Sequence, residues 1–274
     1  FDFSFTSPRD LAHRTVARAL SDLAACGAEP KLCLLGLGLP EDVEIGRVKK
    51  FISELVRQLK RYGAKLAGGD LTEAGRWFIG ITSIGIQKRG KAIKRCGSSP
   101  NELLCTTGRL GLAAAGLTLL KEYPDLAGRF PSLAKAYLRP KPKVAQGVAL
   151  AEHGIATAAI DISDGLFLDA WRLAEASGLS IVIEEARLPV ARKLKEFCRI
   201  TGRRVEEFVS AGDDYELLFT APASRLKRLS ELGWRAYRIG YTKRGAGVYI
   251  EDASGRLKRA PKTGYIHFEK ATRS

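Results

Sequence analysis

Acidic residues and glycines occur together in three segments far apart in the chain, and these residue types are suited to binding cations and phosphates. The three segments are Gly68-Gly69-Asp70, Asp161-Ile162-Ser163-Asp164-Gly165 and Ala211-Gly212-Asp213-Asp214-Tyr215. Glycine lets a backbone approach a ligand closely, and a neighbouring carboxylate can hold a hard cation through its oxygens. Several carboxylates in one place repel one another unless cations neutralise them. The pattern therefore favours Mg²⁺ ions that carry a phosphate-rich substrate.

A fourth carboxylate, Asp22, lies in the apolar helical stretch 20–25. Each acidic segment taken alone is equally compatible with ordinary turns and helix caps, which Asp, Ser and Gly favour. The chain has only three histidines and no Walker A motif, so the usual phosphate-binding P-loop is excluded.

The acidic segments must be positioned by the elements around them. Each follows or precedes a short apolar run typical of a strand, which predicts that all three lie at strand ends, where α/β folds build their sites. Ser7 and Pro8 predict the start of a helix that ends at Gly27. Periodicity predicts further helices over 45–62, 142–153 and 164–177, and one that follows Gly108. Strands are predicted over 31–37, 65–67, 77–86, 103–108, 156–160, 179–183, 215–220 and 248–250.

A run of five cations in eight residues, 88–95, interrupts this alternation. Such a run is typical of a solvated connection, and it stands where one domain could join the next. The alternating elements on both sides predict an α/β or α+β protein in two domains.

Composition agrees with this prediction. The 274 residues are 45% hydrophobic, so the chain can bury a substantial core, and no apolar run approaches the roughly 18 residues needed to cross a bilayer. We expect no signal peptide, no membrane contact and a cytoplasmic location. The five cysteines are odd in number and lack C-x-x-C spacing, which favours buried free thiols over disulfides or zinc. The net charge of +15 is spread along the chain, which favours a solvated surface biased toward phosphorylated substrates and disfavours nucleic acid.

The residues of these segments and their order along the chain resemble the motifs of the thiamine-monophosphate kinase family. This family is part of the superfamily of proteins similar to aminoimidazole-ribonucleotide synthetase. Residues 20–30 resemble the family segment NLSDLAAMGA-x-P, and residues 68–70 resemble its GGDTT. Residues 161–166 are its DISDGL, and residues 210–219 match SGGEDYELLF. Two shorter matches are Leu138-Arg139-Pro140 and Gly264-Tyr265-Ile266-His267-Phe268. The resemblance covers essentially the whole chain.

The resemblance implies a two-domain fold and an activity. An N-terminal ATP- and metal-binding domain over 1–90 would pair its sheet with that of a second copy in a homodimer, and a C-terminal α/β domain would cover 91–274. The chain has no Met and begins with Phe1, and the family has an additional upstream stretch with a Gly-Asp-Asp segment, so we expect this stretch to be missing here. The activity would be ATP-dependent phosphorylation of thiamine monophosphate to thiamine diphosphate, with several Mg²⁺ ions and direct in-line transfer.

Site residues follow from the resemblance position by position. No protein nucleophile is expected, because the acceptor phosphate is itself nucleophilic. The resemblance implies these metal ligands: Asp22, Asp70, Asp161 and Asp164. It implies these ATP-binding residues: Gly69, Asp70, Arg95 and Ser163. It implies these contacts to the thiamine substrate: Asp213, Tyr265 and Asp2.

Departures from the family pattern keep other functions open. Asp213 stands where the family has Glu, Leu71 where it has Thr, and Asp2-Phe3 where many members have His-Phe. Residues 111–113 also lack the Asp-Ser pair that usually follows Gly111. The alternatives are another ATP-dependent enzyme of the superfamily, such as one that makes selenophosphate or aminoimidazole ribonucleotide, and a non-catalytic nucleotide-binding homologue.

Overall fold

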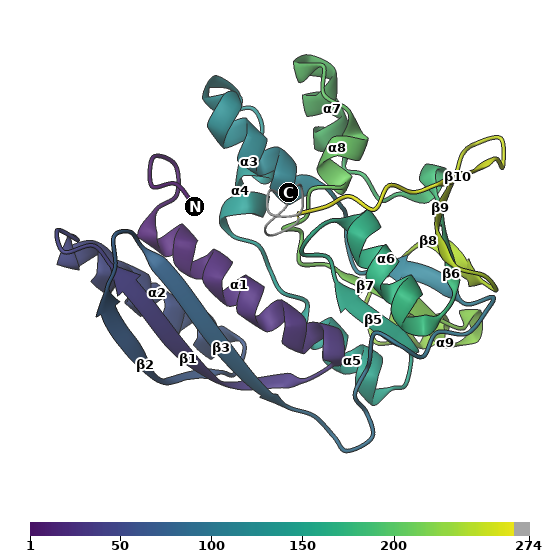
Figure 1. Cartoon of the computed structure of the whole chain (residues 1–274), viewed down its shortest axis with the longest axis horizontal. Helices are drawn as coiled ribbons and strands as arrows, with labels where there is room; N and C mark the ends of the chain where they lie inside the picture. Colours follow the sequence, from purple (N-terminus) through teal and green to yellow (C-terminus); the bar gives the residue numbers. More distant parts are fainter. Residues whose placement is uncertain (266–274) are drawn as a thin grey trace, which may run out of the picture.

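The structure is a computed structural model, and it describes residues 1–265. Two sheets and their helices make up this part of the chain (Figure 1). The helices are α1 (Pro8–Cys26), α2 (Ile45–Arg61), α3 (Leu112–Glu122), α4 (Pro131–Leu138), α5 (Val144–Glu152), α6 (Leu166–Ser177), α7 (Arg192–Thr201), α8 (Val205–Val209) and α9 (Ala223–Glu231), with 3₁₀ turns at Pro124–Leu126 and Glu185–Arg187. The strands are β1 (Glu29–Leu39), β2 (Lys65–Glu73), β3 (Phe78–Ile86), β4 (Leu103–Thr106), β5 (Ala158–Asp161), β6 (Ser180–Glu184), β7 (Leu217–Ala221), β8 (Tyr237–Lys243), β9 (Gly247–Glu251) and β10 (Leu257–Arg259).

Helix α1 begins and ends where its capping residues predict. The Ser7 hydroxyl accepts a hydrogen bond from the Asp10 N–H, Pro8 occupies the first turn, and Gly27 closes the helix in the left-handed conformation. The helix lies along the middle of the molecule (Figure 1). Eleven of its nineteen residues are buried, because it packs against elements of both sheets.

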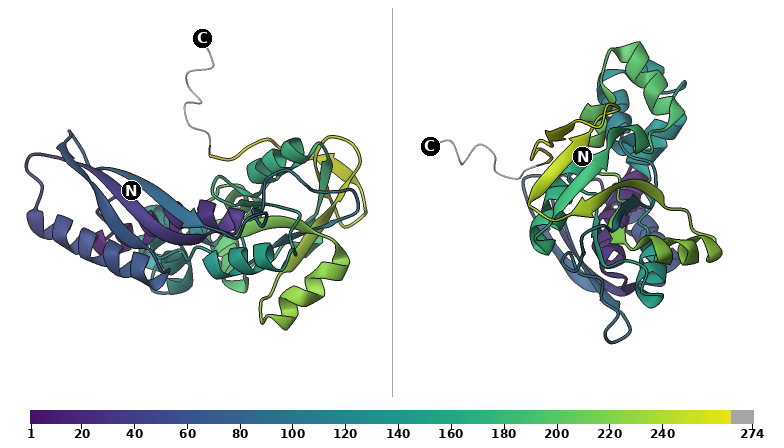
Figure 2. Two further views of the ribbon diagram at one scale, coloured as in Figure 1. Left: turned by 90° about the horizontal axis from the view of Figure 1, so that it is seen from below. Right: turned by 90° about the vertical axis from the view of Figure 1, so that its right-hand side faces the viewer.

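The N-terminal sheet has three strands in the order β2-β1-β3. β1 and β2 are parallel and are joined through α2, whereas β3 is antiparallel to β1. The inward side chains of β1 alternate with exposed ones, as expected for a sheet covered on one side. Cys33, Leu35 and Leu37 are buried with α1 and α2, and Figure 2 shows α2 along that face.

The C-terminal sheet has seven strands in the order β10-β9-β6-β8-β4-β7-β5, antiparallel except for the pair β6 and β9. Its two faces belong to two different cores, because successive side chains point to opposite faces. On β5, Ala158 and Ile160 pack with α6, whereas Ala159 packs in the core that contains α1 and α5. This sheet is therefore covered on both faces.

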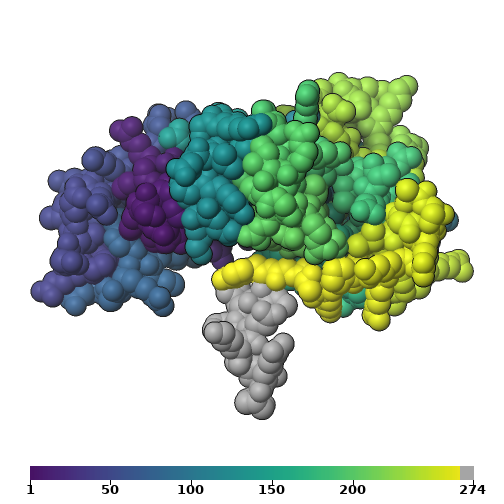
Figure 3. All heavy atoms as spheres, turned by 90° about the horizontal axis from the view of Figure 1, so that it is seen from above, coloured from purple at the N-terminus to yellow at the C-terminus, as the bar shows by residue number. Residues whose placement is uncertain are grey.

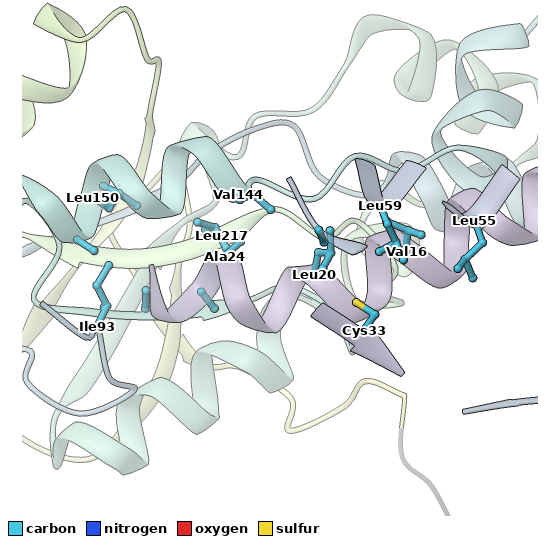
Figure 4. Close-up of a cluster of buried hydrophobic side chains, with 14 of the residues drawn as sticks. Val16, Leu20, Ala24, Cys33, Leu55, Leu59, Ile93, Val144, Leu150 and Leu217 are labelled. Carbon is cyan, nitrogen blue, oxygen red and sulfur yellow. The ribbon is translucent and has the colours of Figure 1, made fainter. Parts of the chain in front are cut away.

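The largest core joins the two sheets through α1. Figure 4 shows Ala24 of α1 near Val144 and Leu217, and Val16 of the same helix near Leu59 of α2. A separate aromatic cluster holds α3, α4, α7 and α8 together, with Phe197 in contact with Phe130, Phe208 and Tyr123.

The sequence prediction was wrong about the first acidic segment. Gly68-Gly69-Asp70 lies inside β2 and not at its end, because pairing with β1 continues through Glu73. A Cβ at Gly69 would lie 1.9 Å from the Leu35 carbonyl oxygen, so the glycine is needed for the two strands to approach. Four helices (α4, α7, α8 and α9) and strands β8 and β10 were not predicted from the pattern.

All five cysteines are free thiols, as expected, but not all of them are buried. Cys96 is exposed and Cys26 is half-buried, which corrects the sequence prediction. Within residues 1–265, no helix is long and apolar enough to cross a membrane.

Candidate active site

Two of the three acidic segments are joined backbone to backbone. β5 and β7 are antiparallel neighbours, and Asp161 at the end of β5 lies opposite Leu217 at the start of β7. The pairing continues beyond the strands, since the N–H groups of Asp213 and Tyr215 donate to the carbonyls of Ser163 and Ile162 at 2.9 and 3.0 Å. Segments 161–165 and 211–215 therefore form one acidic surface.

Two glycines allow this contact. Gly165 and Gly212 both have positive φ, 123° and 84°. A Cβ at Gly165 would lie 2.1 Å from the Ser210 carbonyl oxygen, and a Cβ at Gly212 would lie 2.3 Å from that of Ser163. Any other residue at either position would push the two acidic segments apart.

Asp161 and Asp22 form the first group of charges. Asp161 is buried at the end of β5, and burial together with the charge of Asp22 on α1 raises the pKa of Asp161 to about 6. Ser21 and Arg95 act in the opposite direction on the same pKa. The two carboxylates are thus close enough to repel each other, and a cation beside them would relieve the repulsion.

Asp164 belongs to a second group with Asp169 and Arg172 of α6. The Arg172 guanidinium donates to Asp164 at 2.5 Å and to Asp169 at 2.7 Å. Asp169 is fully buried and accepts hydrogen bonds at 3.1 Å from the N–H groups of Asp164 and Gly165. Burial raises the pKa of Asp169 to about 6, with Asp161 and Asp164 adding to the effect. Asp169 and Arg172 thus fix the conformation of segment 161–165.

Asp213 contacts Arg14, which lies eight residues before Asp22 on α1. The Arg14 guanidinium donates to the Asp213 carboxylate at 2.8 Å and to the Tyr137 carbonyl at 2.7 Å, and it stacks on the Tyr137 ring at 3.8 Å. The buried Tyr215 hydroxyl also donates to Asp213, at 2.8 Å. These contacts hold Asp213 and Tyr215 at positive φ (61° and 50°), a conformation that costs a non-glycine residue about 1–2 kcal/mol.

Asp214 caps helix α3 from a distance. Its carboxylate accepts hydrogen bonds from the N–H groups of Gly111 at 2.6 Å and Ala113 at 3.2 Å. It thereby supplies the cap that the sequence near Gly111 lacks. Burial raises the pKa of Asp214 to about 7, although the two N–H donors favour the charged form.

Gly69 and Asp70 do not join these groups within the described residues. Asp70 pairs with Gly36 in the β1–β2 ladder and is exposed on the open face of the N-terminal sheet. Residues 1–265 contain no group of three or more His, Cys, Asp or Glu side chains placed to hold a metal ion. The four predicted metal ligands therefore do not form one cage in this chain.

The remaining predicted residues lie at the edges of the acidic surface. The Tyr265 N–H donates to the Asp164 carbonyl at 2.9 Å, and the Tyr265 side chain is 59% exposed. Asp2 is exposed near the start of α1. Burial raises the pKa of the Tyr137 hydroxyl, and the charges of Asp213 and Asp2 add to this rise. Of the closing motif, Ile266-His267-Phe268 lie outside the described residues.

Sequence reasoning missed three charged residues of the site. Arg14 makes the contact to Asp213 described above, whereas Asp169 and Arg172 act on segment 161–165. Asp169 and Arg172 follow the predicted DISDGL motif on one helix face, so their i,i+3 spacing was a usable signal. Arg14 had none, because its partner is 199 residues away.

The residues near Asp161 fit a Mg²⁺ ion held by few protein ligands. Mg²⁺ retains water and is commonly bound by one or two carboxylates together with substrate phosphates. The buried carboxylate of Asp161 and the neighbouring carboxylate of Asp22 provide such a pair. A bound cation would relieve the repulsion between them.

Comparisons with known proteins identify the family. Residues 1–87 match the family model for the N-terminal domain of AIR synthase related proteins, and residues 99–253 match that for the C-terminal domain. The thiamine-monophosphate kinase of Pyrococcus horikoshii is 30% identical over 97% of this chain and 81% of its own length. That of Haemophilus influenzae is 39% identical over 82% of this chain and 69% of its own.

A solved structure described as AaThiL complexed with AMPPCP and TMP is similar over the whole fold. It is 30% identical, with a TM-score of 0.85 over 95% of this chain and 81% of its own. The chain thus belongs to the thiamine-monophosphate kinase family of AIR synthase related proteins.

Proposed function

We propose that this protein transfers the γ-phosphoryl group of ATP to the phosphate of thiamine monophosphate, giving thiamine diphosphate and ADP. The observation that carries the proposal is the joined acidic surface of segments 161–165 and 211–215 in a member of this family. A related structure, complexed with AMPPCP and TMP, supports the choice of both substrates.

The reaction needs little acid–base chemistry from the protein. A phosphate oxygen of thiamine monophosphate attacks the γ-phosphorus, and the bond from that phosphorus to the bridging oxygen of ADP breaks. Because the attacking oxygen is already ionised near neutral pH, the protein must mainly align two anions and reduce their repulsion. When bound by the carboxylates near Asp161, Mg²⁺ would supply positive charge that reduces the repulsion between the two phosphate-bearing substrates.

Asp161, Asp22 and Asp164 are proposed as the residues that hold Mg²⁺. Asp161 is fixed by its place at the end of β5, and Asp164 is fixed by Arg172. Asp70 lies on the open sheet face, so as a metal ligand it would act with groups brought there by ATP or by another subunit. Gly69, Arg95 and Ser163 are proposed to contact ATP, and Arg95 is exposed near Asp161.

The thiamine part of the substrate is assigned to the region around Asp213, where Arg14 of α1 contacts it. Arg14 and Asp22 are eight residues apart on this helix, which corresponds to about 12 Å at 1.5 Å per residue. Asp213, oriented by Arg14 and Tyr215, would face the positive thiazolium ring, with Tyr265 and Asp2 as further contacts. The metal and thiamine regions would thus be separated along one rigid helix.

We propose direct transfer without a phosphorylated enzyme. Within the described residues, neither His13 nor His153 contacts the two joined acidic segments, and the carboxylates of Asp164, Asp213 and Asp214 are engaged by Arg side chains or N–H groups. One in-line displacement should invert a chiral γ-phosphate, and initial-rate plots with both substrates should intersect. Retention of configuration, or a phosphorylated enzyme trapped without thiamine monophosphate, would contradict direct transfer.

The proposal includes a homodimer that forms through the N-terminal sheet. It also includes a boundary between the two domains at residue 90. The sheet face opposite α1 and α2 carries five exposed apolar side chains: Leu32, Leu34, Phe78, Ile84 and Ile86. An apolar face of this kind is typical of an interface. Light scattering should give the mass of a dimer for the wild type and of a monomer for Ile84→Lys, with Ile200→Lys, exposed on α7, as the control.

The function is tested by turnover of the purified chain with ATP, Mg²⁺ and thiamine monophosphate. ADP and thiamine diphosphate should form in equal amounts. Asp161→Asn should lower kcat/KM by at least a hundred-fold with little loss of folding, because a metal ligand is replaced by an isosteric amide. Asp125→Asn, an exposed change at a 3₁₀ turn, should behave as wild type.

The alternatives predict different results. A selenophosphate or aminoimidazole-ribonucleotide synthetase would leave thiamine monophosphate unchanged and would turn over its own substrate. A non-catalytic homologue would bind ATP without forming ADP in the presence of any of these acceptors.

A further inference from the structure

A cavity with a high positive charge lies next to the site described above and shares Asp214 with it. It has a volume of about 240 Å³ and opens between the start of α3, helix α4 and segment 139–143. Helices α3 and α4 lie side by side (Figure 1), and in Figure 3 their residues, in teal, stand between the N-terminal part of the chain and α7 and α8. No residue assigned above to Mg²⁺, ATP or thiamine lines this cavity.

Cations dominate the lining. Five of the twelve lining residues are cationic: Arg109, Lys135, Arg139, Lys141 and Lys143. Four of them lie within residues 135–143, and the fold adds Arg109 from just before the start of α3. Like charges around one cavity repel each other, and an anion inside it removes that cost.

The fold neutralises only part of this charge. Arg139 pairs with Asp10 at 2.6 Å, and Lys143 pairs with Glu216 at 2.9 Å. The other three cationic side chains of the lining take part in no hydrogen bond or ion pair with the part of the chain that the structure describes. They are those of Arg109, Lys135 and Lys141.

The two acidic residues of the lining do not compensate for these three cations. Glu216 is engaged by Lys143 and by the Thr107 hydroxyl, which donates at 2.6 Å. Asp214 is engaged by two N–H groups of α3, and burial raises the pKa of Asp214 to about 7, so it carries only part of a charge at neutral pH. The cavity therefore keeps a positive potential.

We propose that this cavity is a second anion site that binds a small phosphorylated solute carrying two or more negative charges. Arg109 presents a planar fork that matches phosphate oxygens, and Lys135 and Lys141 present compact charges. A cavity of about 240 Å³ has room for a diphosphate group. Leu112, Ala136 and Pro140 supply an apolar side for a non-phosphate part of the ligand.

Inorganic pyrophosphate is the probe for this site. Calorimetric titration is performed on the full chain in EDTA, because without divalent cations the carboxylates near Asp161 repel a polyanion. The wild type should bind one pyrophosphate per chain, and orthophosphate should bind more weakly. This result does not rest on the proposed function, since neither ATP nor thiamine monophosphate is present.

A matched pair of double variants locates the binding. Lys135→Gln with Lys141→Gln should weaken pyrophosphate roughly ten-fold, because two charges near the ligand are lost. Lys227→Gln with Arg228→Gln removes the same charge from exposed positions of α9 and should leave affinity within two-fold. All four substituted side chains are exposed, so melting temperatures should match the wild type.

Three results would overturn the proposal. One is the absence of saturable binding at millimolar pyrophosphate. Another is equal weakening by the two pairs, which would reflect the overall charge. The third is tight binding of a single-stranded oligonucleotide. If its affinity equals that of pyrophosphate and depends on Lys135 and Lys141 in the same way, the cavity is a general polyanion surface.

Discussion

Arg14 and Asp213 are 199 residues apart in sequence, yet the Arg14 guanidinium donates a 2.8 Å hydrogen bond to the Asp213 carboxylate. The same guanidinium uses a second nitrogen to reach the Tyr137 carbonyl. One side chain of α1 thus sets the position of the turn before β7 and of the segment that ends α4.

Arg14→Lys should impair thiamine monophosphate more than ATP. Lysine keeps the charge but cannot make both contacts, since it lacks the planar fork. A lost charge-assisted hydrogen bond is worth about 1.5–3 kcal/mol, so KM for thiamine monophosphate should rise about ten-fold or more, with KM for ATP within two-fold. Steady-state kinetics with each substrate varied would measure this.

Arg129→Lys is the matched control, because Arg129 pairs with Glu196 at an exposed position. Exposed pairs contribute little, so this variant should keep both KM values. Equal rises in both KM values for Arg14→Lys would show a general packing role.

Tyr265→Ala should also separate the two substrates. The Tyr265 side chain is exposed beside Asp164, where its ring could stack on the cationic thiazolium. Such stacking is worth about 0.5–2 kcal/mol, or a few-fold to about thirty-fold in affinity. Calorimetry should show weaker thiamine monophosphate binding with ATP binding unchanged, and Tyr265→Phe should restore most of it. If Tyr265→Phe is as weak as Tyr265→Ala, the stacking role is wrong.

Gly69→Ala should disturb the N-terminal sheet. The new methyl group would overlap the Leu35 carbonyl of the neighbouring strand, and overpacking of this kind costs about 1–3 kcal/mol. Gly75→Ala is the control, because a Cβ at Gly75 meets no atom within 4 Å. Thermal melts should show a lower melting temperature for Gly69→Ala alone, and equal melting temperatures would disprove the close approach.

Asp214 should make stability depend on pH. Its pKa rises from 3.8 to about 7 on folding, through burial first and then through the charges of Glu216 and Asp213. The folded state therefore holds a proton that the unfolded state releases, and the stabilisation present below pH 4 is lost as pH rises through 7. Between pH 5 and pH 8 this group should remove about 2–3 kcal/mol from the free energy of unfolding.

Denaturant titrations of wild type and Asp214→Asn at both pH values would measure this loss. The variant should be less stable than wild type mainly at pH 5, and the difference should shrink at pH 8. Asp125→Asn should follow the wild type at both values. A constant difference between Asp214→Asn and wild type would show that Asp214 is charged throughout.

The sequence by itself determined the local features. Ser7, Pro8 and Gly27 specify both ends of α1, because capping depends on residues within one turn of the helix end. The apolar run before Asp161 likewise predicts a strand that delivers an acidic segment at its end, and β5 does so. The motif order was sufficient for the family, which the relatives confirm.

Only the tertiary structure decided which of these features meet. It placed Gly69 inside a strand, because pairing with β1 outweighs the weak strand propensity of glycine. It joined segment 161–165 to 211–215, brought Arg14 to Asp213, and used Asp214 to cap a helix 101 residues away. These contacts depend on how sheets and helices pack, and residue types and spacings along the chain carry no direct record of that packing.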